Sequence, residues 1–144
     1  MANAILWQAA LASRGTVLTT QLNSLAASGQ SVVGTEIDNS TNLDIYGWFE
    51  IGHGVTGGVS AVGDTIEIWM DRCYDGTTYE DGEGVLVVVV PIDVTGADLL
   101  HVYMSQRFRL PPCKVVFTLK NAGNHAMSDT GNIVELFTSN LEVQ

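Results

Sequence analysis

The stretch Leu43–Ile51 reads Leu-Asp-Ile-Tyr-Gly-Trp-Phe-Glu-Ile and decides the fold class. Two sets of residues alternate along it, with Leu43, Ile45, Gly47, Phe49 and Ile51 in one set and Asp44, Tyr46, Trp48 and Glu50 in the other. Successive side chains of a β-strand point to opposite faces of a sheet, so this period of two is typical of a strand with one face in the core. The stretch therefore predicts a half-buried strand that places Tyr46 and Trp48 on its outer face.

Other stretches of the chain continue this strand pattern. They show the same period, or a continuous apolar run, at 31–37, 66–71, 85–92, 100–105, 113–120 and 133–138. Because the run 85–92 is apolar throughout, it predicts a strand buried on both faces. The dipeptides Asp75-Gly76 and Asp81-Gly82 predict turns, since glycine accepts the positive φ of tight turns. About seven strands at this spacing predict an all-β chain, with a single β-sandwich or jelly-roll-like domain over residues 16–144.

The beginning of the chain has a different character. Ile5, Leu6, Trp7 and Leu11 follow neither a strand nor a helix period, and we expect residues 1–15 to form an N-terminal arm. After this arm, apolar residues recur at helical spacing, and a glycine that could cap a helix follows them: Leu18, Leu22, Leu25 and Gly29. This pattern predicts one short helix.

Composition and charge restrict the classes of function. The chain has 144 residues, of which 46% are hydrophobic and 15% charged, which suits one folded domain with its own core. Its apolar runs are far shorter than the roughly 18 to 20 residues that span a bilayer, and its start lacks the basic residues of a secretory signal. The net charge of −10 opposes binding to phosphate backbones. We therefore expect a protein made in the cytoplasm whose partners are neither nucleic acids nor membranes.

Residue types that serve in catalysis or metal binding are present without a recognisable motif. His53, His101 and His125 lack the spacing of a zinc site, and the acidic loop 71–83 lacks the regular spacing of a calcium loop. The sequence has no nucleophile elbow, phosphate-binding loop or dinucleotide-binding glycine pattern. For Cys73 and Cys113 we expect buried thiols, with a disulfide as the alternative. The sequence thus predicts a protein that is not an enzyme and uses no metal or cofactor.

Aromatic residues on predicted outer faces are candidates for contact with a partner. Either another segment of the chain covers these rings, or they anchor a protein partner or stack on sugar rings. Two arginines that share one face of their segment are candidate ion-pair anchors, with ordinary surface charge as the alternative. The predicted contact set is Trp7, Tyr46, Trp48, Trp69, Arg107 and Arg109.

The order of several segments resembles a known family. Residues 16–25 read TVLTTQLNSL, residues 37–44 read IDNSTNLD, and residues 75–82 read DGTTYEDG. They are followed by RLPPCK at 109–114 and LKNAG at 119–123. Over roughly residues 16–138 this order resembles that of small structural proteins of tailed bacteriophages, which are encoded near the head genes.

The resemblance implies a β-sandwich component of the virion, with a capsid decoration or cement protein that stabilises the head as the leading interpretation. The implied partners are the major capsid protein and neighbouring copies of the chain, with a trimer favoured, and the implied location is the capsid surface. In that role the N-terminal arm would reach an adjacent subunit. A tail, neck or fibre-associated structural protein is one alternative, and a carbohydrate-binding module is another.

Overall fold

The computed structural model describes residues 5–7, 12–31, 33–54, 63–80, 84–92 and 101–143. Within these ranges the regular structure is β apart from one 3-10 turn, which confirms the predicted fold class. The elements in chain order are β1 (Ile5–Trp7), β2 (Ala12–Leu18), η1 (Thr20–Leu22), β3 (Ile37–Asp38), β4 (Tyr46–His53), β5 (Thr65–Cys73), β6 (Val85–Pro91), β7 (His101–Met104), β8 (Phe108–Arg109), β9 (Lys114–Asn121), β10 (Ile133–Ser139) and β11 (Leu141–Val143).

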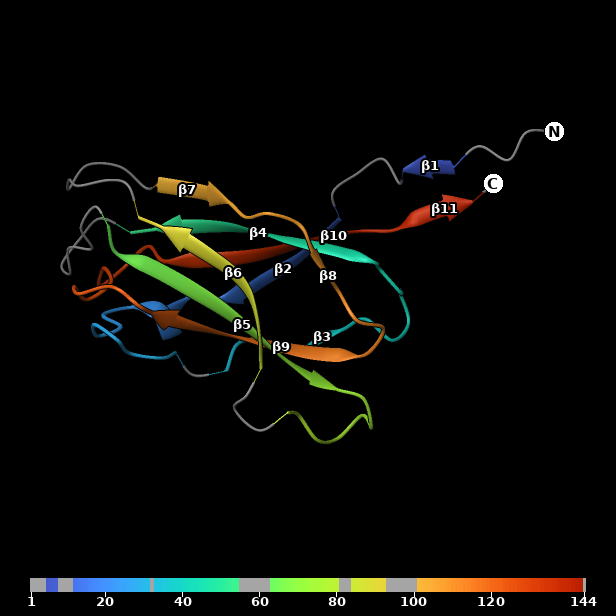
Figure 1. Cartoon of the computed structure of the whole chain (residues 1–144), viewed down its shortest axis with the longest axis horizontal. Coiled ribbons are helices and arrows are strands. Elements are labelled where there is room, and N and C mark those ends of the chain that lie inside the picture. The colour runs from blue at the N-terminus through green and yellow to red at the C-terminus, as the bar shows by residue number, and fades with distance from the viewer. Residues whose placement is uncertain are drawn as a thin grey trace.

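Two antiparallel sheets form the two layers of a β-sandwich (Figure 1). In one sheet the strand order is β2-β10-β4-β7, and β8 also pairs with β4. In the other sheet the order is β3-β9-β5-β6. Strands β6, β7 and β8 therefore lie at sheet edges.

The core lies between the sheets and follows the predicted alternation. Phe49 and Ile51 of β4 are buried, and Ile66 and Ile68 of β5 face them from the other sheet. The rings of Phe49 and Phe117 meet edge to face, with centroids 5.0 Å apart. Truncating a ring of this kind to alanine costs about 3–5 kcal/mol of stability, so this contact between the sheets is a major part of what holds the layers together.

The structure differs from the sequence predictions at the start of the chain. The short helix expected after Thr16 is a single 3-10 turn over Thr20–Leu22, because residues 16–18 belong to β2 and pair with β10. β2 already begins at Ala12, so the sandwich extends into the residues assigned to the arm. The weak strand expected at 31–37 is reduced to β3, which covers Ile37–Asp38.

β1 and β11 pair with each other in a separate two-stranded ribbon. Ile5 lies opposite Val143, and Trp7 lies opposite Leu141. Figure 1 shows this ribbon beyond one end of the two sheets. A two-stranded ribbon is at best marginally stable in water on its own.

The strand β6 corrects a second prediction. The apolar run 85–92 was expected to be buried on both faces, but β6 pairs with β5 alone among the described strands and is an edge strand. Val85, Leu86 and Val89 are 42%, 40% and 52% exposed, while Val88 and Val90 face the core. Hydrophobicity alone does not reveal whether a strand lies at the centre or the edge of a sheet, and here the apolar run is half on the surface.

Candidate functional site: a groove along the open edge of the sandwich

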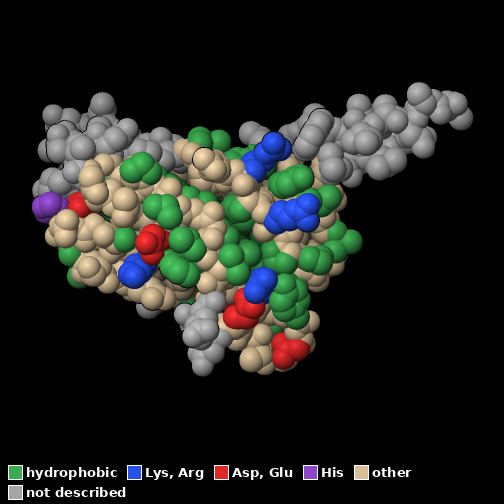
Figure 2. All heavy atoms as spheres, in the orientation of Figure 1, with side chains coloured by type: hydrophobic (Ala, Val, Ile, Leu, Met, Phe, Trp, Pro, Cys, Tyr) green, Lys and Arg blue, Asp and Glu red, His purple; other side chains and the backbone are tan. Residues whose placement is uncertain are grey.

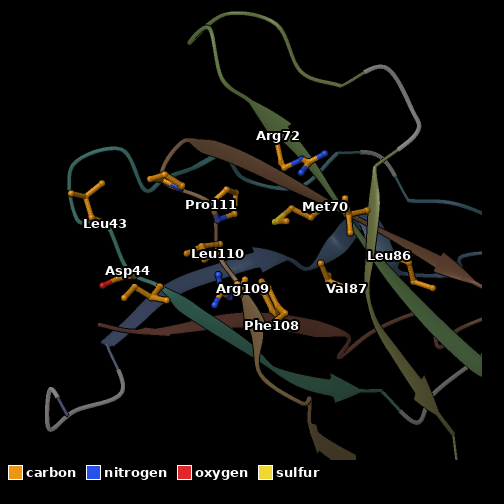
Figure 3. Close-up of a pocket in the computed structure, with 13 residues that line it drawn as sticks. Leu43, Asp44, Met70, Arg72, Leu86, Val87, Phe108, Arg109, Leu110 and Pro111 are labelled. Atoms are coloured by element: carbon orange, nitrogen blue, oxygen red, sulfur yellow. The ribbon is translucent and has the colours of Figure 1, made fainter. Parts of the chain in front are cut away.

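An apolar groove follows β6 along the open edge of the sandwich. Its larger part has a volume of about 620 Å³ and lies between β5, β6, the segment 43–45 and the segment 108–112. Figure 3 shows residues from these segments around the hollow. A smaller part of about 390 Å³ lies between residues 87–91 and 104–106. Val87 lines both parts, so they adjoin along β6.

The bottom of the groove is built on the aromatic core. The ring of Phe108 stacks on that of Phe49, with centroids 4.9 Å apart, and meets Phe117 edge to face at 6.1 Å. Leu110, which follows β8, is buried. The groove therefore rests on a rigid part of the fold, which is the kind of support that a preformed binding surface needs.

One loop holds an exposed leucine at the mouth of the groove. The Asn39 side-chain amide donates to the carbonyl oxygens of Asp44 and Pro111, at 2.8 and 2.9 Å, and its oxygen accepts from the Asp44 N–H at 2.9 Å. Between these contacts, Leu43 has a φ of +53° and is 51% exposed. Positive φ is unfavourable for leucine and is often retained where function requires it. The loop thus holds Leu43 toward solvent at a cost in backbone energy.

Two arginines line the groove, and only one of them is paired with a carboxylate among the described residues. Arg72 donates to both carboxylate oxygens of Glu80, at 2.7 and 2.5 Å. This hydrogen bonding raises the pKa of Arg72 and lowers the pKa of Glu80, so the pair stays ionised. Arg109 also lines the groove but is exposed and makes no ion pair within the described residues. On a chain of net charge −10, Arg109 is therefore a positive charge available to a partner.

Exposed apolar side chains surround this charge. Leu43, Val85 and Leu86 all line the larger part of the groove, and each is at least 40% exposed. On the face drawn in Figure 2, hydrophobic side chains gather beside Lys and Arg side chains. Contiguous exposed apolar surface on a soluble protein commonly marks an interaction site. The groove thus combines exposed apolar surface with an arginine that makes no ion pair among the described residues.

Three of the predicted contact residues lie together at the β4–β8 end of the groove. Tyr46 is the cross-strand partner of Arg109. The guanidinium of Arg107 lies over the Tyr46 ring, 5.4 Å from its centroid, which is a cation–π geometry. The sequence placed these residues on separate segments, and pairing of β4 with β8 brings them together.

The remaining predicted contact residues lie elsewhere. Trp48 is on the outer face of its strand, as predicted, but it is only 6% exposed and its ring stacks on Phe137 at 6.2 Å. Trp48 is therefore not an exposed anchor. Trp69 is half-buried on the outer face of the other sheet, and its indole N–H donates to Glu67 at 3.1 Å. Trp7 belongs to β1, and its side chain is outside the described part of the structure.

The other candidate groups do not gather into a metal site within the described ranges. Among those residues no three His, Cys, Asp or Glu side chains are grouped closely enough to hold a metal ion. His125 instead contacts Asp64, with 2.9 Å between Nδ1 and Oδ2. Cys73 and Cys113 are buried free thiols, and burial raises the pKa of both. Residues 81–83 of the acidic loop lie outside the described part. In a separate respect, no helix that is described is long and apolar enough to cross a membrane.

Sequence reasoning missed most of the groove. Leu43 was assigned to the core face and Val85 and Leu86 to a fully buried strand, although all three are exposed. The neighbouring Pro111-Pro112 was the available signal, because prolines cannot donate to a ladder and occur where a sheet ends. The two prolines indicate that a sheet ends there, but they do not show that β6 lies on the other side of the groove.

Comparison with known proteins gives little further information. No family model matches the chain, and no curated protein matches it. Among solved structures, it is similar to a Clostridium thermocellum endo-1,4-β-D-xylanase 10B comprising CBM22-1 and GH10 modules, in complex with xylohexaose. The TM-score is 0.47 and the identity 9%, over 88% of this chain and 24% of the xylanase chain. This chain thus spans about a quarter of the length of that structure.

Proposed function

We propose that this protein is a non-enzymatic structural component of a bacteriophage particle that decorates the capsid and docks through the β6 groove. The resemblance of its segments to phage structural proteins supplies the context. The observation that carries the docking role is the exposed apolar edge along β6, with Leu43, Val85 and Leu86 around a groove that also holds Arg109. The proposed partner surface belongs to the major capsid protein and offers apolar side chains and a carboxylate.

Repetition strengthens a contact of this kind. Many copies of the chain on one shell can each contribute a modest interface, and linked contacts give a large combined effect. A trimer would multiply the contacts further, and the β1–β11 ribbon is suited to reach a neighbouring subunit.

A co-sedimentation assay with capsids that lack this chain tests the docking role. Leu86→Lys and Arg109→Glu should each weaken attachment by about tenfold or more, because the first puts a charge into an apolar contact and the second reverses the charge offered to a carboxylate. Val33→Lys is the matched control, since Val33 is 54% exposed and does not line the groove. Equal attachment of all variants and the parent would contradict docking through the groove.

Two alternative functions, a neck or tail protein and a carbohydrate-binding module, would give different experimental results. A neck or tail protein built on the same sandwich would attach at a few sites of special symmetry and leave the capsid surface bare. A carbohydrate-binding module would need an exposed aromatic surface, which Trp48 does not provide because it is buried. Trp69 is the remaining candidate for that role, and it does not line the groove.

A further inference from the structure

A small hollow lies on the outer face of the second sheet, apart from the proposed docking surface. It has a volume of about 190 Å³ and is lined by Gln30, Trp69, Asp71, Gly84, Thr118 and Lys120. Trp69 and Asp71 are two residues apart on β5 and so share a face, and Thr118 of β9 lies opposite Trp69. None of these residues lines the β6 groove.

Asp71 lines this hollow, and one of its carboxylate oxygens is buried without a hydrogen bond. The residue is only 8% exposed, and its Oδ1 atom is buried without a hydrogen-bond donor. Gly84 packs against it so closely that an added Cβ would lie 2.3 Å from Oδ1. A buried acceptor without a partner costs about 1–3 kcal/mol. Because Gly84 covers Oδ1, a molecule in the hollow would donate to the other carboxylate oxygen, Oδ2, which accepts no hydrogen bond from the described residues.

Trp69 provides an oriented apolar surface beside that acceptor. Its indole N–H donates to Glu67 Oε2 at 3.1 Å, which fixes the ring on the sheet. Its cross-strand neighbour on β6 is Leu86, which is 40% exposed. The hollow therefore places an apolar platform beside the Asp71 carboxylate.

The charges around the hollow are of both signs, so they give no strong preference for an anion or a cation. Asp71 and the nearby Glu67 oppose an anion, whereas Lys120, the cross-strand partner of Glu67, opposes a cation. The volume is below the about 300–1,000 Å³ that holds drug-sized ligands. A neutral ring with hydroxyl donors and an apolar face matches these features.

We propose that this hollow binds one neutral sugar residue, with a hydroxyl donating to Asp71 and the apolar face of the ring lying on Trp69. The hollow shares no lining residue with the β6 groove, so different variants test the two sites. In a phage particle it would add recognition of a neutral polysaccharide to the structural role.

Affinity electrophoresis in gels containing xylan, galactomannan, β-glucan or dextran tests this site with the full chain. At least one of these polysaccharides should retard the protein. Trp69→Ala should weaken that binding about tenfold or more, because an aromatic anchor is lost. Tyr74→Ala is the matched control, since Tyr74 is an aromatic residue that is 66% exposed and does not line the hollow.

A second variant tests the acceptor separately. Asp71→Leu should also weaken binding about tenfold, because a hydrogen bond to a charged group is lost. Replacing an unsatisfied buried carboxylate by an apolar group should leave the chain folded, which urea unfolding would check. Unretarded migration in all four gels would overturn the proposal. So would retardation that neither variant changes, or retardation confined to anionic polygalacturonate or cationic chitosan.

Discussion

Gly54 shows how closely single residues are constrained in this fold. It follows β4, and its N–H donates to Asn132 Oδ1 at 3.2 Å. A Cβ at this position would lie 1.7 Å from the carbonyl oxygen of Thr130. We expect Gly54→Ala to lower the free energy of unfolding by about 3 kcal/mol or more, because backbone atoms would have to move.

Gly76→Ala is the control for that substitution in a urea unfolding experiment. Gly76 has a φ of +80° with no atom within 4 Å of an added Cβ, so only the backbone conformation is penalised. The expected loss there is about 1–2 kcal/mol. Losses of equal size at the two glycines would show that the close approach at Gly54 is not a determinant of stability.

Asp71 gives a prediction about pH at the same scale. Burial, and to a smaller extent the charge of Glu80, raises the pKa of Asp71 in the folded chain. The Asp71 carboxyl therefore binds its proton more tightly in the folded chain than in the unfolded chain, where the pKa of an aspartate is about 3.9. The contribution of Asp71 to stability therefore falls as the pH rises from the unfolded pKa through the folded one.

Asp71→Asn removes this titration. Urea unfolding should find the variant more stable relative to the parent at pH 7 than at pH 3, because only the parent must bury a charge at the higher pH. A variant less stable relative to the parent at pH 7 than at pH 3 would mean that the ionised carboxylate has a stabilising partner.

Among the elements, we expect the β1–β11 ribbon to serve attachment and β2 to serve stability. Deleting residues 2–11 removes β1 but leaves β2, which begins at Ala12. We expect the sandwich to keep its thermal unfolding midpoint within a few degrees while attachment to capsids weakens. Deleting residues 2–18 also removes the buried Val17 and Leu18 and the strand that pairs with β10, so it should abolish cooperative unfolding. If the shorter deletion left attachment unchanged, the ribbon would have no part in docking.

The strands also show what local sequence could predict. Alternation in β4 and β5 identified Phe49, Ile66 and Ile68 as core residues, because a period of two directly reports a half-buried strand. The edge position of β6 depends on the order of strands from distant parts of the chain, which an apolar run does not encode. The burial of Trp48 likewise depends on its register opposite Phe137 in β10. The gathering of Tyr46, Arg107 and Arg109 needed the pairing of β4 with β8, and for that reason the candidate site was predicted only in part.

At the scale of the whole molecule, we propose that the β-sandwich docks through its β6 edge in many copies on a phage head. The most direct test is the number of copies per purified virion, measured by quantitative mass spectrometry relative to the major capsid protein. Decoration of the capsid predicts a number on the order of hundreds, because symmetric shells repeat each contact. A number near about six or twelve would place the chain at the neck or tail, and its absence from the virion would contradict a structural role in the particle.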